Sequence, residues 1–155
     1  MLEGGSSWSV SQTLSWLEFR TETDRYAPYG RRMDMKIELI LLPVSDVDRA
    51  KHFYVDQVGF HADFDQTVNE NLRFVQLTPP GSACSIAIGK GITNKTPGSV
   101  GGLIMVVKDA DQAHDELAAR GVAVTDVHQE DWGRFTEFSD PDGNNWSLQQ
   151  LPKRG

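Results

Sequence analysis

The sequence predicts an α+β fold in which two βαβββ modules form a curved eight-stranded mixed sheet around a cavity. The first observation behind this prediction is an internal repeat: residues 44–50 recur as residues 107–113, with Val, Asp, Asp and Ala each matched 63 residues apart. Further along, Arg73-Phe74 recurs as Arg134-Phe135, so the order of the matches is kept. The second observation is that each copy has the pattern of a strand, a helix and three short strands, a unit that cannot bury its own sheet face alone.

The first copy begins with an apolar stretch at residues 36–44, which predicts a buried strand that ends at the helix cap Ser45-Asp46. Apolar residues then recur near helical spacing until Gly59, where a left-handed backbone ends the predicted helix. Three short strands follow. The last two are joined by Thr78-Pro79-Pro80-Gly81, because proline presets φ and glycine permits a positive φ.

The second copy has the same order of signals. Residues 103–107 predict the strand, and Asp109 with Gln112 predicts a capping box at the start of the helix. Gly121 ends that helix. The turn between the last two strands is Asp-Pro-Asp-Gly-Asn at residues 140–144.

These boundaries divide the chain into an extension and one domain. Residues 1–34 lie outside the repeat and are interpreted as an N-terminal arm or an artefact of an upstream start. Residues 35–152 form the domain, with one module at 35–89 and the other at 101–152. The Gly-, Thr- and Asn-rich segment 90–100 is the predicted linker.

The composition excludes several classes of function. A net charge of −7, with no basic cluster longer than Arg31-Arg32, argues against nucleic acid as a partner, because phosphate binding needs concentrated positive charge. No apolar run approaches the length that spans a membrane, and the N-terminus has no secretory pattern. The single cysteine, Cys84, cannot form an internal disulfide, which indicates a cytoplasmic protein.

The repeat resembles the vicinal oxygen chelate superfamily, the glyoxalase/bleomycin resistance protein/dioxygenase type. The resemblance depends on Val-Ser-Asp-Val-Asp-Arg-Ala-Lys-His-Phe-Tyr at 44–54 and Phe-Ser-Asp-Pro-Asp-Gly-Asn at 138–144. It implies the fold and leaves the reaction open, since members include lyases, isomerases, dioxygenases, transferases and drug-sequestering proteins. It also implies a homodimer, whose modules pair either within one chain or between two chains.

Metal-dependent members of this superfamily hold an ion with His or Glu at four strand positions. The resemblance places these positions at Leu39, Gly102, Ser147 and Ser85, with Ala87 as the alternative to Ser85 if the register differs. Transition metals need imidazole, carboxylate or thiolate ligands, which these residues do not supply. We therefore expect neither a metal nor another cofactor.

The face of the sheet predicted to be concave carries apolar side chains with a few hydroxyls and amides, which indicates a site for a small, partly apolar organic molecule. Trp132 is a candidate to stack on a planar ligand, and Arg134 to hold an anion. The structural alternative is that Arg73 and Arg134, which occupy equivalent positions in the repeat, share a structural role such as a salt bridge formed by each. The candidate ligand-binding residues are Leu39, Ser85, Gly102, Ile104, Trp132, Arg134, Ser147 and Gln149.

His128 and Glu137 are the candidates for catalysis by proton transfer, and Glu137 qualifies only if it faces the cavity instead of water. The leading hypothesis is metal-independent binding of the small molecule, either to sequester it or for acid-base chemistry. One alternative is a metal-dependent enzyme of the family, a lyase, isomerase or dioxygenase, with a relocated site that draws on Glu38, Gln76, His128 and Glu137. The other alternative is a structural or interaction module with a filled cavity.

Overall fold

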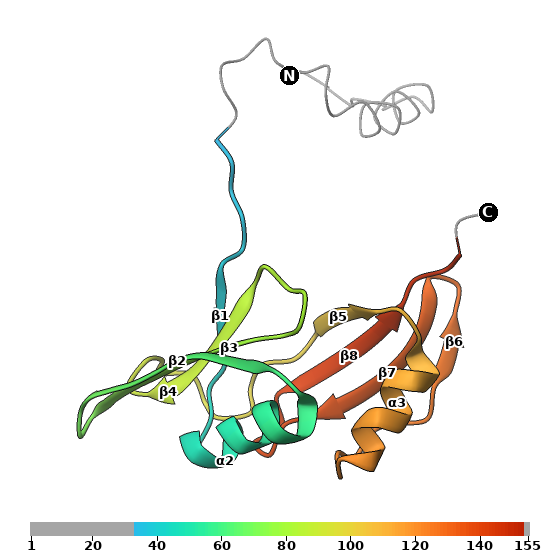
Figure 1. Cartoon of the computed structure of the whole chain (residues 1–155). Helices are drawn as coiled ribbons and strands as arrows, with labels where there is room; N and C mark the ends of the chain where they lie inside the picture. The colour runs from blue at the N-terminus through green and yellow to red at the C-terminus, as the bar shows by residue number, and fades with distance from the viewer. Residues whose placement is uncertain (1–32, 154–155) are drawn as a thin grey trace, which may run out of the picture. The chain divides into compact units, whose positions relative to one another are not determined.

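The computed structural model describes residues 33–153 (Figure 1). The chain divides into a unit up to Lys36 and a compact unit that begins at Ile37. Residues 33–36 are exposed and have no regular secondary structure. The rest of the predicted extension 1–34 lies outside the described residues.

This unit contains two successive βαβββ modules, which confirms the predicted fold class (Figure 1). In the first module the helix α2 continues directly as the π-helix η1. The elements of the first module are β1 (Leu39–Leu41), α2 (Val47–His52), η1 (Phe53–Val58), β2 (His61–Asn69), β3 (Leu72–Thr78) and β4 (Ser85–Lys90). Those of the second module are β5 (Leu103–Val107), α3 (Ala110–Ala119), β6 (His128–Glu130), β7 (Gly133–Ser139) and β8 (Asn145–Gln150).

Each module forms a four-stranded sheet of its own, in the orders β1-β4-β3-β2 and β5-β8-β7-β6. The first and last strands of each module are parallel, and the other neighbours are antiparallel. β1 and β5 are edge strands, so among residues 33–153 the eight strands form two sheets where the sequence predicted one continuous sheet. The modules are held together by side chains and turns instead of by strand pairing.

The helices begin where the capping residues predict. Asp46 accepts a hydrogen bond from the backbone N–H of Arg49 at 2.9 Å and so caps α2. Asp109 accepts from the N–H groups of Asp111 and Gln112 and caps α3. The predicted capping box is only half formed, because the Gln112 side chain donates to Glu116 instead of returning to Asp109.

The first helix ends at Gly59, as predicted, in a left-handed conformation with a φ of 98°. The N–H groups of Gly59 and Phe60 both donate to the Tyr54 carbonyl, at 2.9 and 2.8 Å. The preceding π turn carries the adjacent aromatic residues Phe53 and Tyr54, and both are buried. Glycine adopts this backbone without the steric cost that a Cβ would add.

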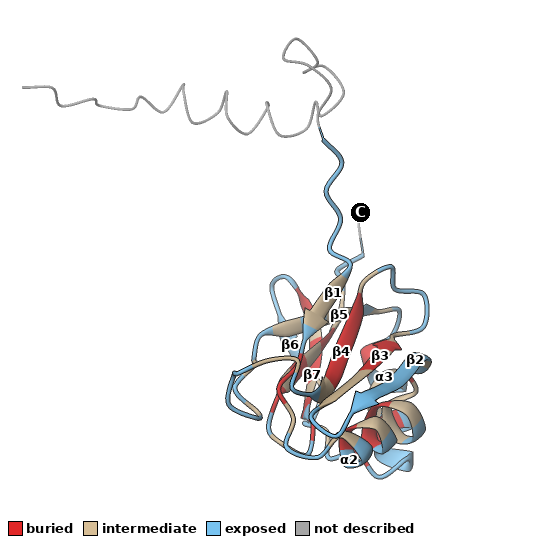
Figure 2. Cartoon of the chain, turned by 90° about the vertical axis from the view of Figure 1, so that its left-hand side faces the viewer, coloured by how far each residue is buried: buried red, intermediate tan, exposed pale blue. Residues whose placement is uncertain are grey.

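A single hydrophobic core lies between the helix-bearing sides of the two sheets, and Figure 2 shows buried residues on β3, β4 and β7 and on the helices. Aromatic rings cross from one module to the other. The Phe53 and Phe138 rings are 6.0 Å apart, and Trp146 lies 6.2 Å from Tyr54 and 5.9 Å from Phe60. Trp146 is therefore packed under a helix that belongs to the other module.

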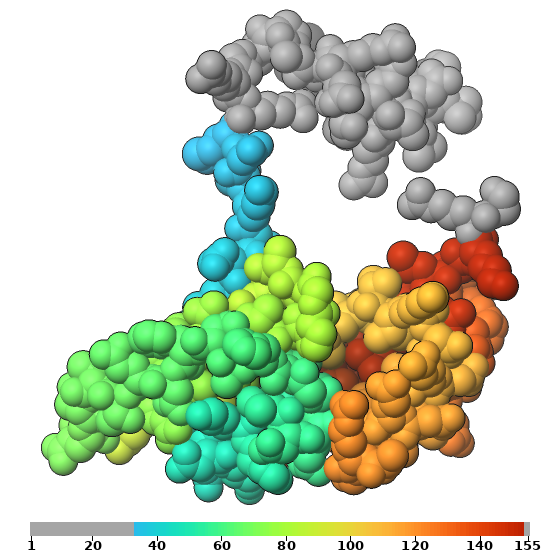
Figure 3. All heavy atoms as spheres, in the orientation of Figure 1, coloured from blue at the N-terminus to red at the C-terminus, as the bar shows by residue number. Residues whose placement is uncertain are grey.

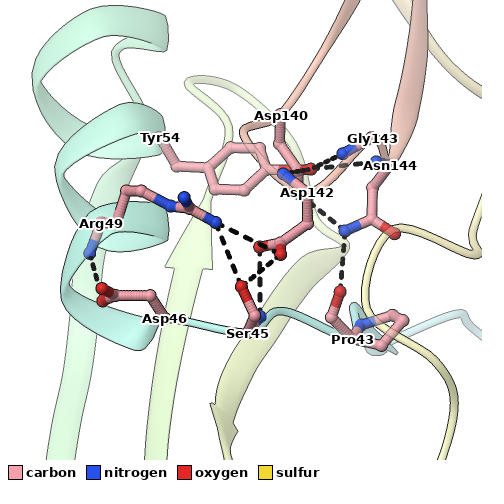
Figure 4. A network of polar contacts seen from close by, with 9 residues as sticks. All are labelled: Pro43, Ser45, Asp46, Arg49, Tyr54, Asp140, Asp142, Gly143 and Asn144. Atoms are coloured by element: carbon pink, nitrogen blue, oxygen red, sulfur yellow. Dashed lines mark hydrogen bonds and ion pairs between the residues drawn. The ribbon is translucent and has the colours of Figure 1, made fainter.

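The Asp-Pro-Asp-Gly-Asn turn organises a buried polar network beside this core (Figure 4). Asp140 Oδ1 accepts the backbone N–H groups of Asp142, Gly143 and Asn144 at 3.0, 2.9 and 2.9 Å. Asp140 Oδ2 accepts from the Tyr54 hydroxyl at 2.8 Å and from Asn144 Nδ2 at 2.7 Å. One carboxylate thus shapes its own turn and holds a tyrosine from the first module.

Two further residues of the turn also reach the first module (Figure 4). Asn144 Nδ2 donates to the Pro43 carbonyl at 2.9 Å. Asp142 accepts from the hydroxyl and the N–H of Ser45, and from Arg49 Nη2 at 3.3 Å. The turn predicted as a simple hairpin connection therefore makes polar contacts between the modules, in addition to those of Gln57 and Val58 with Arg120 at the end of α3.

The repeat mates Arg73 and Arg134 have the same structural role, as one of the two interpretations predicted. Arg73 Nη1 pairs with Asp48 Oδ1 at 2.7 Å, and Arg134 Nη2 bonds Asp111 Oδ1 at 3.0 Å. The two aspartates are themselves repeat mates near the starts of α2 and α3. Each arginine thus ties a strand to the first turn of its module's helix.

Asp65 should make the first module sensitive to acid. The Arg73 guanidinium and, next, the Lys51 ammonium hold the pKa of Asp65 well below its usual range. A depressed pKa contributes stability above the unfolded value of about 4 and loses it as the pH falls. We expect Asp65→Asn to lower the free energy of unfolding by about 1 kcal/mol at pH 7, a value that allows for solvent screening.

Urea unfolding of the wild type and Asp65→Asn between pH 7 and pH 2 measures this effect. The difference in unfolding free energy should shrink as the pH falls below about 4. Asp115→Asn is the control, because Asp115 is 81% exposed and bonds only its neighbour His114. A difference between wild type and Asp65→Asn that stays constant over the whole pH range would show that the ion pairs contribute nothing.

Candidate functional site

Each sheet has one face covered by helices and one face turned away from them, which we call the open face. Successive residues on a strand point to opposite faces, so the residues that alternate with those on the helix side point to the open face. In the first module Val75, Leu77 and Ile86 are fully buried on the helix side. The open faces are those that the sequence predicts as concave.

The open face of the first module brings together two of the predicted ligand-binding residues. Leu39 pairs with Ser85 across β1 and β4. Ser85 Oγ also lies 2.6 Å from Thr78 Oγ1 and 3.3 Å from Gln76 Nε2. Ser85 is buried, while Leu41, which pairs with Ala87, is exposed.

The open face of the second module holds four more predicted residues. Ile104 pairs with Ser147, and Ser147 in turn pairs with Glu137, so the three form one row across β5, β8 and β7. Ser147 Oγ donates to Glu137 Oε1 at 3.2 Å. Gln149 is two residues further along β8, and its amide donates to the carbonyl of Trp132 at 2.9 Å. Trp132 itself lies in the turn before β7, and its side chain is exposed.

His128, the other candidate for catalysis, is also on this face. It pairs with Phe135 across β6 and β7, and the two rings stack with centroids 5.8 Å apart. None of the hydrogen bonds within residues 33–153 joins His128 to Glu137 or to Asp131. The structure therefore puts His128 and Glu137 on one face without coupling them.

The register corrects the repeat mapping of Ser85. In the second module Phe138 pairs with Trp146, and in the first module Leu77 pairs with Ile86. The residue that follows Trp146 is Ser147, so its counterpart is the residue that follows Ile86, which is Ala87. Ser147 and Ala87 are 60 residues apart, whereas the mapping of Ser147 onto Ser85 assumed 62, so the position is Ala87, the alternative to Ser85.

Arg134 is a second correction. It lies on the helix side of β7, three residues from Glu137, and its guanidinium is paired with Asp111. Residues three apart on a strand point to opposite faces. Arg134 therefore points away from the open face, where the sequence placed it as the candidate to hold an anion, and its guanidinium is paired with Asp111 instead.

A pocket of about 280 Å³ lies between the two modules, beside the edge strands β1 and β5. It brings together three of the predicted ligand-binding residues, Ser85, Gly102 and Ile104. Trp146 and Met105 contribute to its inner wall, and Cys84 lies beside Ser85. The walls are mostly apolar, as sites for small organic molecules are. Leu39, Ser147, Gln149 and Trp132 are not among the lining residues.

A smaller hollow of about 170 Å³ lies on the helix side, between the end of η1 and α3. Figure 3 shows the molecule hollowed here between the two modules, with atoms of β8 at the bottom. Its walls include Phe60, Leu117 and Leu148, and it shares Pro79 and Met105 with the larger pocket. The sequence did not predict this hollow, because it forms between residues that the repeat assigns to the core.

The residues present do not fit a metal of the kind that metal-dependent members hold. The corresponding strand positions carry an alkyl side chain, a hydrogen or a hydroxyl at Leu39, Gly102, Ala87 and Ser147. Within residues 33–153, no three His, Cys, Asp or Glu side chains come close enough to share an ion. Glu137 brings one carboxylate to this region, which is too few ligands for such an ion.

The family model of the Glyoxalase/Bleomycin resistance protein/Dioxygenase superfamily matches residues 36–148, and the chain belongs to this superfamily. TnmS3, an antibiotic binding protein from Streptomyces sp. CB03234, is similar in structure, with 37% identity, a TM-score of 0.72 and coverage of 79% of this chain and all of that one. A glyoxalase/bleomycin resistance protein from the same organism is 39% identical, with a TM-score of 0.66 and coverage of 74% and 100%. A superfamily member from Sphaerobacter thermophilus is 35% identical, with a TM-score of 0.68 and coverage of 77% and 99%.

No helix in the described part of the chain is both long and apolar enough to cross a membrane.

Proposed function

We propose that this protein binds a small, partly apolar organic molecule in the pocket between its modules and sequesters it without a metal. The observation that carries the proposal is the pocket between the modules, where Ser85, Gly102 and Ile104 meet in a mostly apolar wall. Its volume of about 280 Å³ is close to the lower end of the range of about 300–1,000 Å³ for ligand sites. The similarity to an antibiotic binding protein supports the same class of function.

Sequestration is favoured over acid-base catalysis because the two candidate residues are held apart from each other. His128 is stacked on Phe135, and Glu137 accepts from Ser147. A general base needs a hydrogen-bonded route to the proton that it removes, and a partner that orients it. The open hollows also argue against a module with a filled cavity.

The proposal includes a homodimer in which a second copy completes the site. On β5 the side chains of Ile104 and Val106 are 58% and 63% exposed, and they point out from the open face. β1 and β5 are also edge strands, with one hydrogen-bonded side unpaired in the described chain. Adjacent exposed apolar side chains on a face beside a free edge are typical of an interface. The free thiol of Cys84 fits a cytoplasmic protein.

Metal analysis combined with ligand screening tests this function. We expect the purified protein to hold less than about one metal ion per ten chains, since its strand positions offer no donor set. We expect small aromatic or polycyclic compounds to raise its melting temperature, because a ligand that binds only the native state stabilises it. The rise should be unchanged after treatment with a chelator. Stoichiometric zinc, nickel, manganese or iron, with ligand binding lost on chelation, would contradict the proposal.

A further inference from the structure

A chain of hydrogen bonds runs across the open face of the first module and ends in the pocket. Ser85 Oγ lies 2.6 Å from Thr78 Oγ1, and the Thr78 hydroxyl donates to Asp63 Oδ2. The other oxygen of Asp63 lies 2.9 Å from Nδ1 of His61. A bulge in β2 at Asp63 brings this carboxylate to the face of Thr78. Ser85 therefore connects the pocket wall to an aspartate outside the pocket.

The chemistry of the groups fixes the direction of this chain. A carboxylate accepts hydrogen bonds and donates none, whereas a hydroxyl has a single hydrogen to donate. The hydrogen bonds from Thr78 and from His61 hold the pKa of Asp63 below its usual range, so it is a carboxylate at neutral pH. Thr78 gives its hydrogen to Asp63, and Ser85 must then give its own hydrogen to Thr78. Gln76 Nε2 donates to one lone pair of Ser85 Oγ at 3.3 Å, so what Ser85 can offer to the pocket is its remaining lone pair.

The serine on the open face of the second module also donates its hydroxyl hydrogen within the protein. The Ser147 hydroxyl donates to Glu137 Oε1 at 3.2 Å, so its hydrogen is also taken up by a carboxylate. Glu137 has a second oxygen, and Ser147 has its lone pairs, both on the open face. The polar atoms that these residues leave free are therefore acceptors in both modules, although Ser147 and Glu137 lie on the open face and do not line the pocket.

The charges on the two open faces also disfavour an anionic ligand. Asp63 and Glu137 bring carboxylates to the open faces. The guanidinium groups of Arg73 and Arg134, the repeat mates near these strands, are paired on the helix side with Asp48 and Asp111. A carboxylate or phosphate ligand would meet lone pairs and negative charge, and such contacts cost free energy.

From these contacts we infer that the ligand is neutral or cationic and enters with an O–H or N–H donor directed at Ser85, and that Asp63 sets this preference from outside the pocket. The inference depends on the proposed function, because it names the ligand class of the same site. Asp63 is a positioning residue that acts through Thr78. Loss of one buried donor–acceptor match changes affinity by about tenfold.

Three probes with one apolar body test the ligand class by calorimetry: 2-naphthol, 2-methoxynaphthalene and 2-naphthoate. We expect the wild type to bind 2-naphthol about tenfold tighter than 2-methoxynaphthalene, which can only accept, and to bind 2-naphthoate most weakly. Equal affinity for the first two probes, or tighter binding of 2-naphthoate, overturns the inference and leaves the proposed function standing. Binding of none of the three overturns the proposed function itself.

Asp63→Asn tests whether the chain of hydrogen bonds sets this preference. An amide nitrogen in place of Oδ2 donates to Thr78, so Thr78 can donate to Ser85, and Ser85 can turn its hydrogen to the pocket. The tenfold preference for 2-naphthol should be lost or reversed, mainly because 2-methoxynaphthalene binds tighter. Thr78→Val, which cuts the chain, should also remove the preference.

The matched control is Asp56→Asn. Asp56 makes the same kind of contact with a histidine, His52, at 2.8 Å, but on the exposed surface of the first helix and without a hydroxyl chain. It should leave the ratio of the two affinities unchanged. Hydroxyl-proton NMR gives a readout that needs no ligand: the Thr78 hydroxyl proton should be shifted downfield in the wild type and move upfield in Asp63→Asn. An unchanged affinity ratio and an unchanged proton signal in Asp63→Asn would overturn the inference.

Discussion

Asp140→Ala is expected to lower the free energy of unfolding by about 4 kcal/mol, the largest effect of a single substitution that the structure predicts. Asp140 is almost fully buried and accepts five hydrogen bonds from the turn and from the first module. Its removal leaves the Tyr54 hydroxyl and the Asn144 amide without their acceptor in a site that water does not reach. Breaking a buried charged network from one side costs about 3–5 kcal/mol.

Urea unfolding at pH 7 measures this cost, and three further variants separate its sources. Asp140→Asn keeps one acceptor oxygen and should cost about half as much. Tyr54→Phe in the Asp140→Ala background should cost little more, because its hydroxyl has already lost its acceptor, which is the non-additivity expected within one network. Asp115→Ala is the exposed control and should change the unfolding free energy by less than about 0.5 kcal/mol. A cost below about 1 kcal/mol for Asp140→Ala would mean that the hydrogen bonds of Asp140 contribute little to holding the modules together.

Asp140 also shows which features of the structure can be predicted from the sequence and which cannot. Asp-Pro-Asp-Gly-Asn predicts a turn because its residue types favour turn backbone, and that local prediction is confirmed. Its role between the modules depends on Tyr54, which is 86 residues earlier in the chain. Nothing in local spacing indicates such a contact, because it arises from how two folded modules pack. The repeat therefore predicts the modules and not their junction.

The candidate site likewise has features that the sequence predicted and features that it did not. Strand parity correctly grouped Ile104, Ser147 and Gln149 on one face, since alternation along a strand is a local property. The same parity contained a signal against Arg134, because a residue three positions from Glu137 on one strand points to the other face. Asp48 and Asp111 also occupy equivalent positions in the repeat, which indicated an equivalent ion-pair partner for each arginine. The chain from Asp63 to Ser85 was missed because a β-bulge interrupts the alternation at Asp63.

The second large effect is expected from charges placed on the open face of β5. Ile104→Asp and Val106→Asp each put a carboxylate where the proposed dimer buries an apolar side chain, and Ile104 also lines the pocket. Both residues are exposed in the single chain, so its folding should change little. Burying an unpaired charge at an interface costs several kcal/mol. We expect the double variant to dimerise at least about a hundredfold more weakly and to lose binding of apolar probes.

Sedimentation velocity across a concentration range gives the dimer dissociation constant, and circular dichroism with urea unfolding shows that each variant is folded. The control is Val68→Asp, because Val68 is an equally exposed valine, at 57%, on β2 instead of β5. Its dimerisation and probe binding should match the wild type, since β2 is at the opposite edge of the first sheet from β1 and Val68 does not line the pocket. If the double variant dimerises like the wild type but binds no probe, the face is a ligand site within one chain. If it loses dimerisation and keeps probe binding, the pocket between β1 and β5 needs no second copy.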